Sequence, residues 1–135
     1  MSKKLILTLF CVLSTLIIFS QRPEPDTFKT KKGDLIVQPI LHGTLVMLFN
    51  DKIIYVDPYG GANAFAGMAK PDLILITDIH GDHLNEDTLD ALEINNTPII
   101  VPQAVADKMS EKYQNLSVRM SMSFCSANRS SKKHQ

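Results

Sequence analysis

The feature that most constrains the fold of this chain is a short apolar run, residues 73–77, that ends in a cluster of Asp and His. An apolar run of this length is typical of a strand that is covered on both faces. Two Asp and two His follow within six residues, and Asn85 then predicts the N-terminus of a helix near Glu86. A strand, a polar turn and a helix in this order indicate an α/β fold with its chemistry at the strand end.

The rest of the central sequence predicts further strands and helices around this unit. Residues 44–49 and 53–56 flank turn-forming residues, which predicts an antiparallel β-hairpin. Residues 35–41 contain Pro39 and predict an edge strand, because proline cannot donate a ladder hydrogen bond. We also expect one strand and two helices further on, at 98–101, 86–94 and 103–113. The order of elements predicts the α/β (α+β) class, with an antiparallel hairpin followed by strand–helix units.

The first twenty residues form a segment of their own. Lys3 and Lys4 precede an apolar run at 5–19, and the small Ser20 is followed by polar residues, which is the pattern of a secretory signal peptide. We therefore expect cleavage near Ser20 and Gln21 and a periplasmic or secreted protein. The alternative is a membrane anchor formed by 5–19, but fifteen helical residues span about 22 Å, less than the ~30 Å hydrocarbon core.

The charge of the chain is unevenly distributed. Its 135 residues carry 14 basic and 14 acidic side chains, so no general basic field for nucleic acid exists. Residues 21–116 hold all fourteen acids, whereas 117–135 hold four bases, no acid and six serines. We predict a linker at 21–34, a partial domain at 35–116 and a disordered basic tail at 117–135. The abrupt change of composition also suggests a truncated or frameshifted gene.

The cluster after residue 77 has the side chains of a metal site. Imidazole and carboxylate groups, here on Asp78, His80, Asp82 and His83, are ordinary ligands of Zn²⁺ and similar ions. Alternation along the strand end can place Asp78 with His80, and Gly81 can turn the chain tightly so that the other two approach. Two such pairs can hold two metals and make hydroxide at neutral pH. The alternative is a set of solvated turn and cap residues.

At this point the sequence resembles a family. The run Thr77-Asp78-Ile79-His80-Gly81-Asp82-His83 is similar to the His-x-His-x-Asp-His signature of metallo-β-lactamase-fold hydrolases, and most similar to a lactonase-like subgroup. The hairpin that ends in Val56-Asp57-Pro58 and the Pro71-Asp72-Leu73-Ile74 lead-in also match. The resemblance covers roughly residues 35–115.

The resemblance implies roles for individual residues. His80 would bind a first metal, while Asp82 and His83 would bind a second, with Asp82 also catalytic through the attacking hydroxide. Asp78 replaces the family's first His, so Zn²⁺ is expected at one or two sites, with Mn²⁺ or Fe²⁺ as alternatives. Asp57 would support the metal ligands without binding the metal itself; the alternative is a plain turn residue before proline. His42 would face the cleft; the alternative is a surface histidine.

The family's later ligands have no counterpart, because the one later histidine, His134, lies in the tail. The resemblance therefore implies the N-terminal half of an αββα sandwich. We expect an exported, truncated hydrolase in which metal-bound hydroxide attacks an ester, lactone, amide or phosphoester of an unidentified small molecule. The alternatives are a non-catalytic fragment that binds metal weakly and a small exported metal-binding module. Without a partner sheet, we expect the isolated chain to be inactive as a hydrolase and to be marginally folded, aggregation-prone or dependent on self-association.

Overall fold

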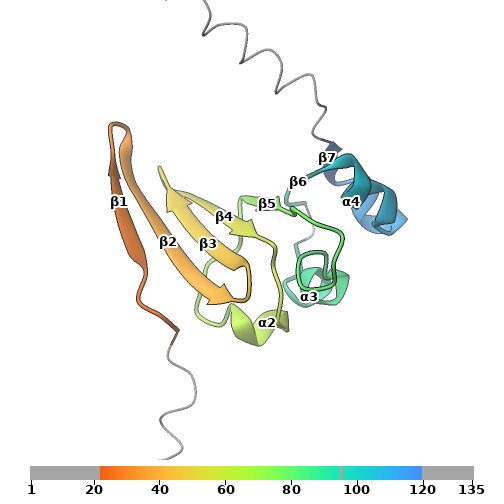
Figure 1. Cartoon of the computed structure of the whole chain (residues 1–135), viewed down its shortest axis with the longest axis horizontal. Coiled ribbons are helices and arrows are strands. Elements are labelled where there is room, and N and C mark those ends of the chain that lie inside the picture. The colour runs from red at the N-terminus through yellow and green to blue at the C-terminus, as the bar shows by residue number, and fades with distance from the viewer. Residues whose placement is uncertain (1–21, 95, 120–135) are drawn as a thin grey trace, which may run out of the picture.

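The computed structural model describes residues 22–94 and 96–119 (Figure 1). The predicted signal peptide and the tail from residue 120, with His134, lie outside the described residues. Within the described part, no helix is long and apolar enough to cross a membrane. The strands and helices, in chain order, are β1 (Asp26–Thr30), β2 (Gly33–Leu41), β3 (Thr44–Phe49), β4 (Lys52–Val56), α2 (Gly61–Ala64), β5 (Leu73–Leu75), α3 (Glu86–Ala91), β6 (Ile99–Val101), α4 (Gln103–Lys108), α5 (Glu111–Gln114) and β7 (Ser117–Arg119).

All seven strands form one sheet, and their order across the sheet is their order along the chain. The strands from β1 to β4 pair antiparallel, and those from β4 to β7 pair parallel. The short links in the first half permit hairpins, whereas parallel pairing requires the helical crossovers of the second half. This mixed sheet with its helices confirms the predicted α/β (α+β) class, and β3 with β4 confirms the predicted hairpin.

The N-terminal side of the sheet differs from the prediction. The linker expected at 21–34 contains β1 and the start of β2, so the strand expected at an edge is an inner one. The sequence gives little sign of β1, because its charged residues resemble those of a linker. In the structure these charges pair across the hairpin: Lys29 of β1 and Asp34 of β2 lie 2.6 Å apart. Proline is tolerated in β2 beside the register shift between Pro39 and Leu41.

Two C-terminal elements also differ. The single helix expected at 103–113 is broken into α4 and α5, because Met109 and Ser110 adopt extended backbone with ψ near 150°. The Ser110 amide donates to the Glu86 carboxylate at 2.7 Å instead of continuing a helix. The predicted disordered tail begins with β7, which pairs with β6.

The two faces of the sheet are buried to different degrees. Tyr55, Ile74 and Ile99 are neighbours across β4, β5 and β6, and all three are buried against the helical layer. Leu73 and Leu75 point to the other face and remain half-buried. The strand at 73–77 was expected to be covered on both faces, and this expectation is wrong for the described residues.

Candidate functional site

Parallel pairing of β4 and β5 brings two polar side chains to one edge of the sheet. Val56 pairs with Leu75, so Asp57 and Thr77 follow strands that end at the same level. The Asp57 amide continues the ladder by donating to the Leu75 carbonyl at 2.8 Å. Carboxyl ends of neighbouring parallel strands are where ligand sites of α/β folds occur.

Asp57 is the buried centre of this edge, with 4% of its side chain exposed. Its Oδ1 accepts from the Thr77 amide at 2.7 Å, and its Oδ2 accepts from the Thr77 hydroxyl at 2.6 Å. The Thr44 hydroxyl donates to the Asp57 carbonyl at 2.6 Å. Asp57 also has a φ of 45°, a region that Asp tolerates better than most residues. The Asp57 side chain is therefore held in place by its hydrogen bonds with Thr77.

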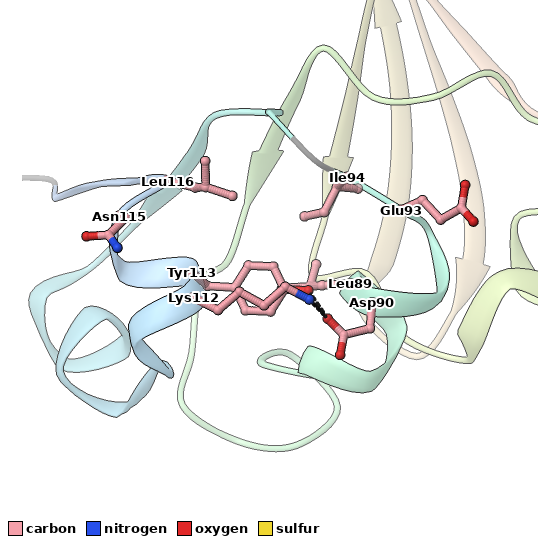
Figure 2. Close-up of a pocket in the computed structure, with 8 residues that line it drawn as sticks. All are labelled: Leu89, Asp90, Glu93, Ile94, Lys112, Tyr113, Asn115 and Leu116. Atoms are coloured by element: carbon pink, nitrogen blue, oxygen red, sulfur yellow. Dashed lines mark hydrogen bonds and ion pairs between the residues drawn. The ribbon is translucent and has the colours of Figure 1, made fainter.

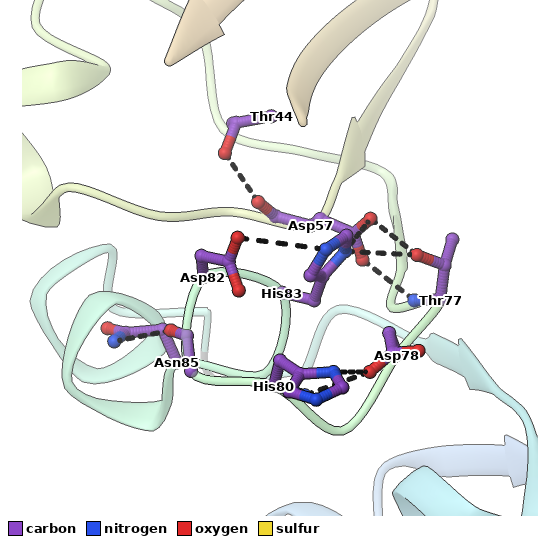
Figure 3. Close-up of polar contacts among 9 residues, drawn as sticks. Thr44, Asp57, Thr77, Asp78, His80, Asp82, His83 and Asn85 are labelled. Atoms are coloured by element: carbon purple, nitrogen blue, oxygen red, sulfur yellow. Dashed lines mark hydrogen bonds and ion pairs between the residues drawn. The ribbon is translucent and has the colours of Figure 1, made fainter. Parts of the chain in front are cut away.

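His83 contacts both Asp57 and Thr77. A tight turn, in which the amides of His83 and Leu84 donate to the His80 carbonyl, returns the chain toward the sheet edge. His83 Nδ1 lies 2.8 Å from Asp57 Oδ2 and 3.2 Å from the Thr77 hydroxyl (Figure 3). The hydrogen bond with Asp57 raises the pKa of His83, and the charges of Asp57 and Asp82 add to the rise. The imidazole is therefore oriented from behind by a buried carboxylate.

The opposite nitrogen of His83 faces the rest of the motif. His83 Nε2 lies 3.8 Å from Asp82 Oδ2, and 29% of the His83 side chain is exposed. A histidine whose Nδ1 is held by a carboxylate and whose Nε2 is accessible has the geometry of a metal ligand. The structure therefore brings together three of the predicted site residues, Asp57, Asp82 and His83.

Asp78 and His80 form a second, separate pair. His80 Nδ1 and the His80 amide both contact Asp78 Oδ1, and the amide donates at 3.0 Å (Figure 3). These hydrogen bonds, the backbone one first, hold the pKa of the Asp78 carboxyl below its usual range. His80 has 75% of its side chain exposed, so little besides Asp78 orients it. Gly81 has no left-handed φ, so the tight turn does not depend on glycine as predicted.

His42 makes no polar bond to Asp57, Asp82 or His83 among the described residues. Its ring meets the Tyr59 ring edge-on at 5.5 Å between centroids. The next residue, Gly43, lies against His83, because a Cβ built on Gly43 would be 3.6 Å from His83 Cε1. The link between β2 and β3 therefore lies against one side of the His83 ring, and a Cβ at position 43 would make an ordinary van der Waals contact with it.

The donors fit a metal ion only in part. His83 Nε2 and the Asp82 carboxylate face a shared space, whereas Asp78 Oδ1 is already engaged by His80. No group of three His, Cys, Asp or Glu side chains among residues 22–94 and 96–119 is arranged to hold an ion. Zinc sites in proteins use three or four protein ligands. The described residues thus provide a partial donor set rather than a complete site.

Two threonines of the site had no signal in the sequence that would mark them as functional. Thr77 bridges Asp57 and His83, and Thr44 fixes the backbone of Asp57, yet both read as ordinary strand residues. A single hint was available for Thr77, namely a hydroxyl directly before the Asp and His cluster. Threonine in strands is too common for that position to distinguish a bridging role.

A separate cavity of about 300 Å³ lies between α3 and α5, and none of the predicted site residues lines it (Figure 2). Leu89 and Ile94 supply apolar surface there, while Asp90 accepts from the Tyr113 hydroxyl and pairs with Lys112. Burial, more than the bond to Asp90, raises the pKa of Tyr113 to about 12. The polar groups are satisfied by one another, which is typical of a structural contact between helices.

No family model and no curated protein matches this chain. A similar solved structure is a crystal structure of a Parabacteroides distasonis ATCC 8503 protein that has been assigned as a metal-dependent hydrolase. The two are 36% identical, with a TM-score of 0.55, over 63% of this chain and 39% of that one. The present chain therefore spans less than half the length of that protein.

Proposed function

We propose that this chain contributes to a metal-dependent hydrolase of the metallo-β-lactamase type, with its site at Asp57, Asp82 and His83. The observation that carries the proposal is the His83 ring, held by a buried carboxylate on Nδ1 and facing Asp82 with Nε2. The similarity to a protein assigned as a metal-dependent hydrolase supports the same class. Further donors would come from residues outside the described part of the chain.

The chain's own residues have distinct tasks in this proposal. Asp57, held by Thr77, keeps the Nδ1 proton on His83, so that the lone pair of Nε2 is directed outward. Asp82 adds a carboxylate oxygen beside Nε2, where it can also accept a proton from a water molecule. Asp78 and His80 would supply a second pair of donors. A divalent ion, when bound, supplies Lewis-acid activation of water for attack on an ester, lactone, amide or phosphoester.

Zn²⁺ is the ion that we propose first, because imidazole nitrogen with carboxylate oxygen suits it. Mn²⁺ and Fe²⁺ are the alternatives, since both accept oxygen-rich donor sets and Asp78 stands where the resembled family has histidine. The substrate would be a small molecule.

Metal-dependent hydrolysis is the direct test. A longer version of the protein, in which further residues supply the remaining donors, is given Zn²⁺ or Mn²⁺ and assayed on 4-nitrophenyl esters, lactones and 4-nitrophenyl phosphates, with a chelator control. We expect turnover that chelation abolishes and His83→Ala lowers at least 100-fold, whereas the matched His42→Ala lowers it less than threefold. Turnover that is insensitive to both the chelator and His83→Ala would refute the proposal.

A second candidate is a non-catalytic fragment, or a small metal-binding module, that binds metal weakly. The lack of three clustered donors among the described residues favours it. Calorimetric titration of the full chain with Zn²⁺ separates the two. Metal binding that His83→Ala removes, together with no turnover on any substrate of the panel, supports this second candidate.

We also propose that the protein is exported, on the strength of the charged and apolar N-terminal segment. Expressed with its own N-terminus, it should be recovered outside the cytoplasm with a new N-terminus near Gln21. Mature protein that retains Met1 in the soluble cytoplasmic fraction would exclude export. Retention in the membrane with Met1 present would indicate the anchor instead.

A further inference from the structure

The last residue of α4 reaches back to the metal motif. The Lys108 ammonium donates to the Ile79 carbonyl at 2.9 Å, across 29 residues of sequence. Ile79 stands between Asp78 and His80, so this bond is made to the turn that carries the exposed pair. Among the described residues, it is the only hydrogen bond that joins this turn to a side chain outside residues 77–85. Lys108 therefore fastens the turn to the helical layer.

The break between α4 and α5 provides a second contact on the other side of the motif. The Ser110 amide donates to the Glu86 carboxylate at 2.7 Å, and Glu86 is the first residue of α3. Met109, between the two donor residues, is 3% exposed and belongs to the hydrophobic core. The core therefore fixes the position from which Lys108 and Ser110 donate to the two ends of the motif.

A cavity of about 520 Å³ separates the motif from the helix break. Ile79 and Gly81 line it from the motif, whereas Lys108 and Ser110 line it from the helix break. Side chains do not fill this space, so hydrogen bonds rather than close packing connect the two parts there. A hydrogen bond from a charged donor is stronger than one from a neutral donor, so the contact of Lys108 should matter most for the turn.

We propose that Lys108 is a positioning residue, which holds the turn with Asp78 and His80 in its place beside the site. The two side chains are held only by their own loop, so their place relative to His83 depends on what fixes that loop. Reacting groups that act together lose efficiency when one is misplaced by about 1 Å. The effect of Lys108 on catalysis rests on the proposed hydrolase function, whereas its effect on the order of the turn does not.

Amide hydrogen exchange of the full chain, measured by NMR, tests the effect on the turn. The His80 amide donates to Asp78 Oδ1 at 3.0 Å, so its exchange rate reports the opening of the turn. Lys108→Met keeps an unbranched side chain but removes the donor, and we expect about fivefold faster exchange at His80. Lys108→Arg keeps a charged donor and should restore the wild-type rate to within about twofold.

Lys112→Met is the matched control for the loss of a lysine. Lys112 also ties a helix to another element, through Asp90, but makes no hydrogen bond to the motif among the described residues. We expect the wild-type exchange rate at His80 in this variant, and unchanged circular dichroism in all variants. Equal rates in wild type and Lys108→Met would overturn the proposal. So would equal acceleration by Lys108→Met and Lys112→Met, because it would report a general loosening of the fold.

The same variants, made in a longer version of the protein that has the remaining donors, test the effect on catalysis. Lys108→Met should lower kcat about tenfold and leave KM within about twofold, and Lys108→Arg should restore kcat. A wild-type kcat in Lys108→Met would overturn the catalytic effect. Absence of turnover in the wild type would refute the proposed hydrolase function instead, and the exchange rates would still decide whether Lys108 holds the turn.

Discussion

His80 and His83 are three residues apart, and each pairs through its Nδ1 with a carboxylate, but the two pairs differ in burial and in how far apart their members are in the sequence. His83 and Asp57 come from separate elements, 26 residues apart, and the carboxylate is buried at the end of a strand. His80 and Asp78 are two residues apart in one exposed turn. The first pair is held by the fold, whereas the second is held only by its own loop. Spacing along the sequence therefore places donors near one another, but burial decides which donor is preorganised.

The largest expected difference between the pairs is in stability. Asp57→Ala leaves the Thr77 amide, the Thr77 hydroxyl and His83 without the acceptor that the buried Asp57 carboxylate provides, and the loss of several hydrogen bonds to one charged group is costly. We expect the free energy of unfolding to fall by about 3 kcal/mol. Asp78→Ala should change it by less than ~0.5 kcal/mol, as most exposed substitutions do. Urea unfolding of the metal-free full chain, followed by circular dichroism, provides both values, and equal losses would erase the contrast.

A substitution in the exposed pair of Asp78 and His80 should change which metal ion the site prefers. Asp78→His exchanges a carboxylate oxygen for an imidazole nitrogen, which suits Zn²⁺ better than Mn²⁺. If Asp78 is a ligand, we expect the ratio of zinc to manganese affinity to rise about tenfold in competition titrations. Asp107→His is the control, because Asp107 is exposed on α4 and lies outside the motif. An unchanged ratio in Asp78→His would remove Asp78 from the ligand set.

The smallest expected effect is a pH dependence of stability from the buried pair. The pKa of His83 is raised in the folded protein, above the value of about 6.5 that it has unfolded. The folded state then binds the proton more tightly, so this contribution is complete below about pH 6.5. It is lost as the pH rises through the folded pKa. Urea midpoints of the metal-free chain, measured from pH 5.5 to 9, should show this loss in wild type and His80→Gln but not in His83→Gln.

Much of the fold follows from local pattern. The hairpin of β3 and β4 and the Asn85 cap of α3, where the Asn85 side chain accepts from the Thr88 amide, have direct sequence signals. The polar strand β1 does not, because Lys29 and Thr27 in an edge hairpin look like a charged linker. The break between α4 and α5 depends on the bond from Ser110 to Glu86, which is 24 residues away. A contact between residues this far apart in the sequence cannot be predicted from the local pattern of apolar residues.

The candidate site, like the fold, could be predicted from the sequence only in part. Asp78, His80, Asp82 and His83 are adjacent in the sequence, so a site at this position could be predicted. Their separation into two groups could not be predicted, because it depends on where β4 ends beside β5 and on the turn that returns His83. Thr77 becomes important only through the two partners that this packing brings to it.

Zinc affinity of the full chain tests most directly whether the buried pair is the preorganised half of a metal site. Asp57→Asn keeps the size of the side chain but removes the charge that holds His83, and Asp78→Asn makes the same change in the exposed pair. Loss of a group that orients a ligand typically costs 10–100-fold in metal affinity. We expect about a 30-fold higher dissociation constant for Zn²⁺ in Asp57→Asn, and less than a threefold change in Asp78→Asn. Equal affinities in wild type and Asp57→Asn, or a larger loss in Asp78→Asn, would contradict the assignment of His83 and Asp57 as the centre of the site.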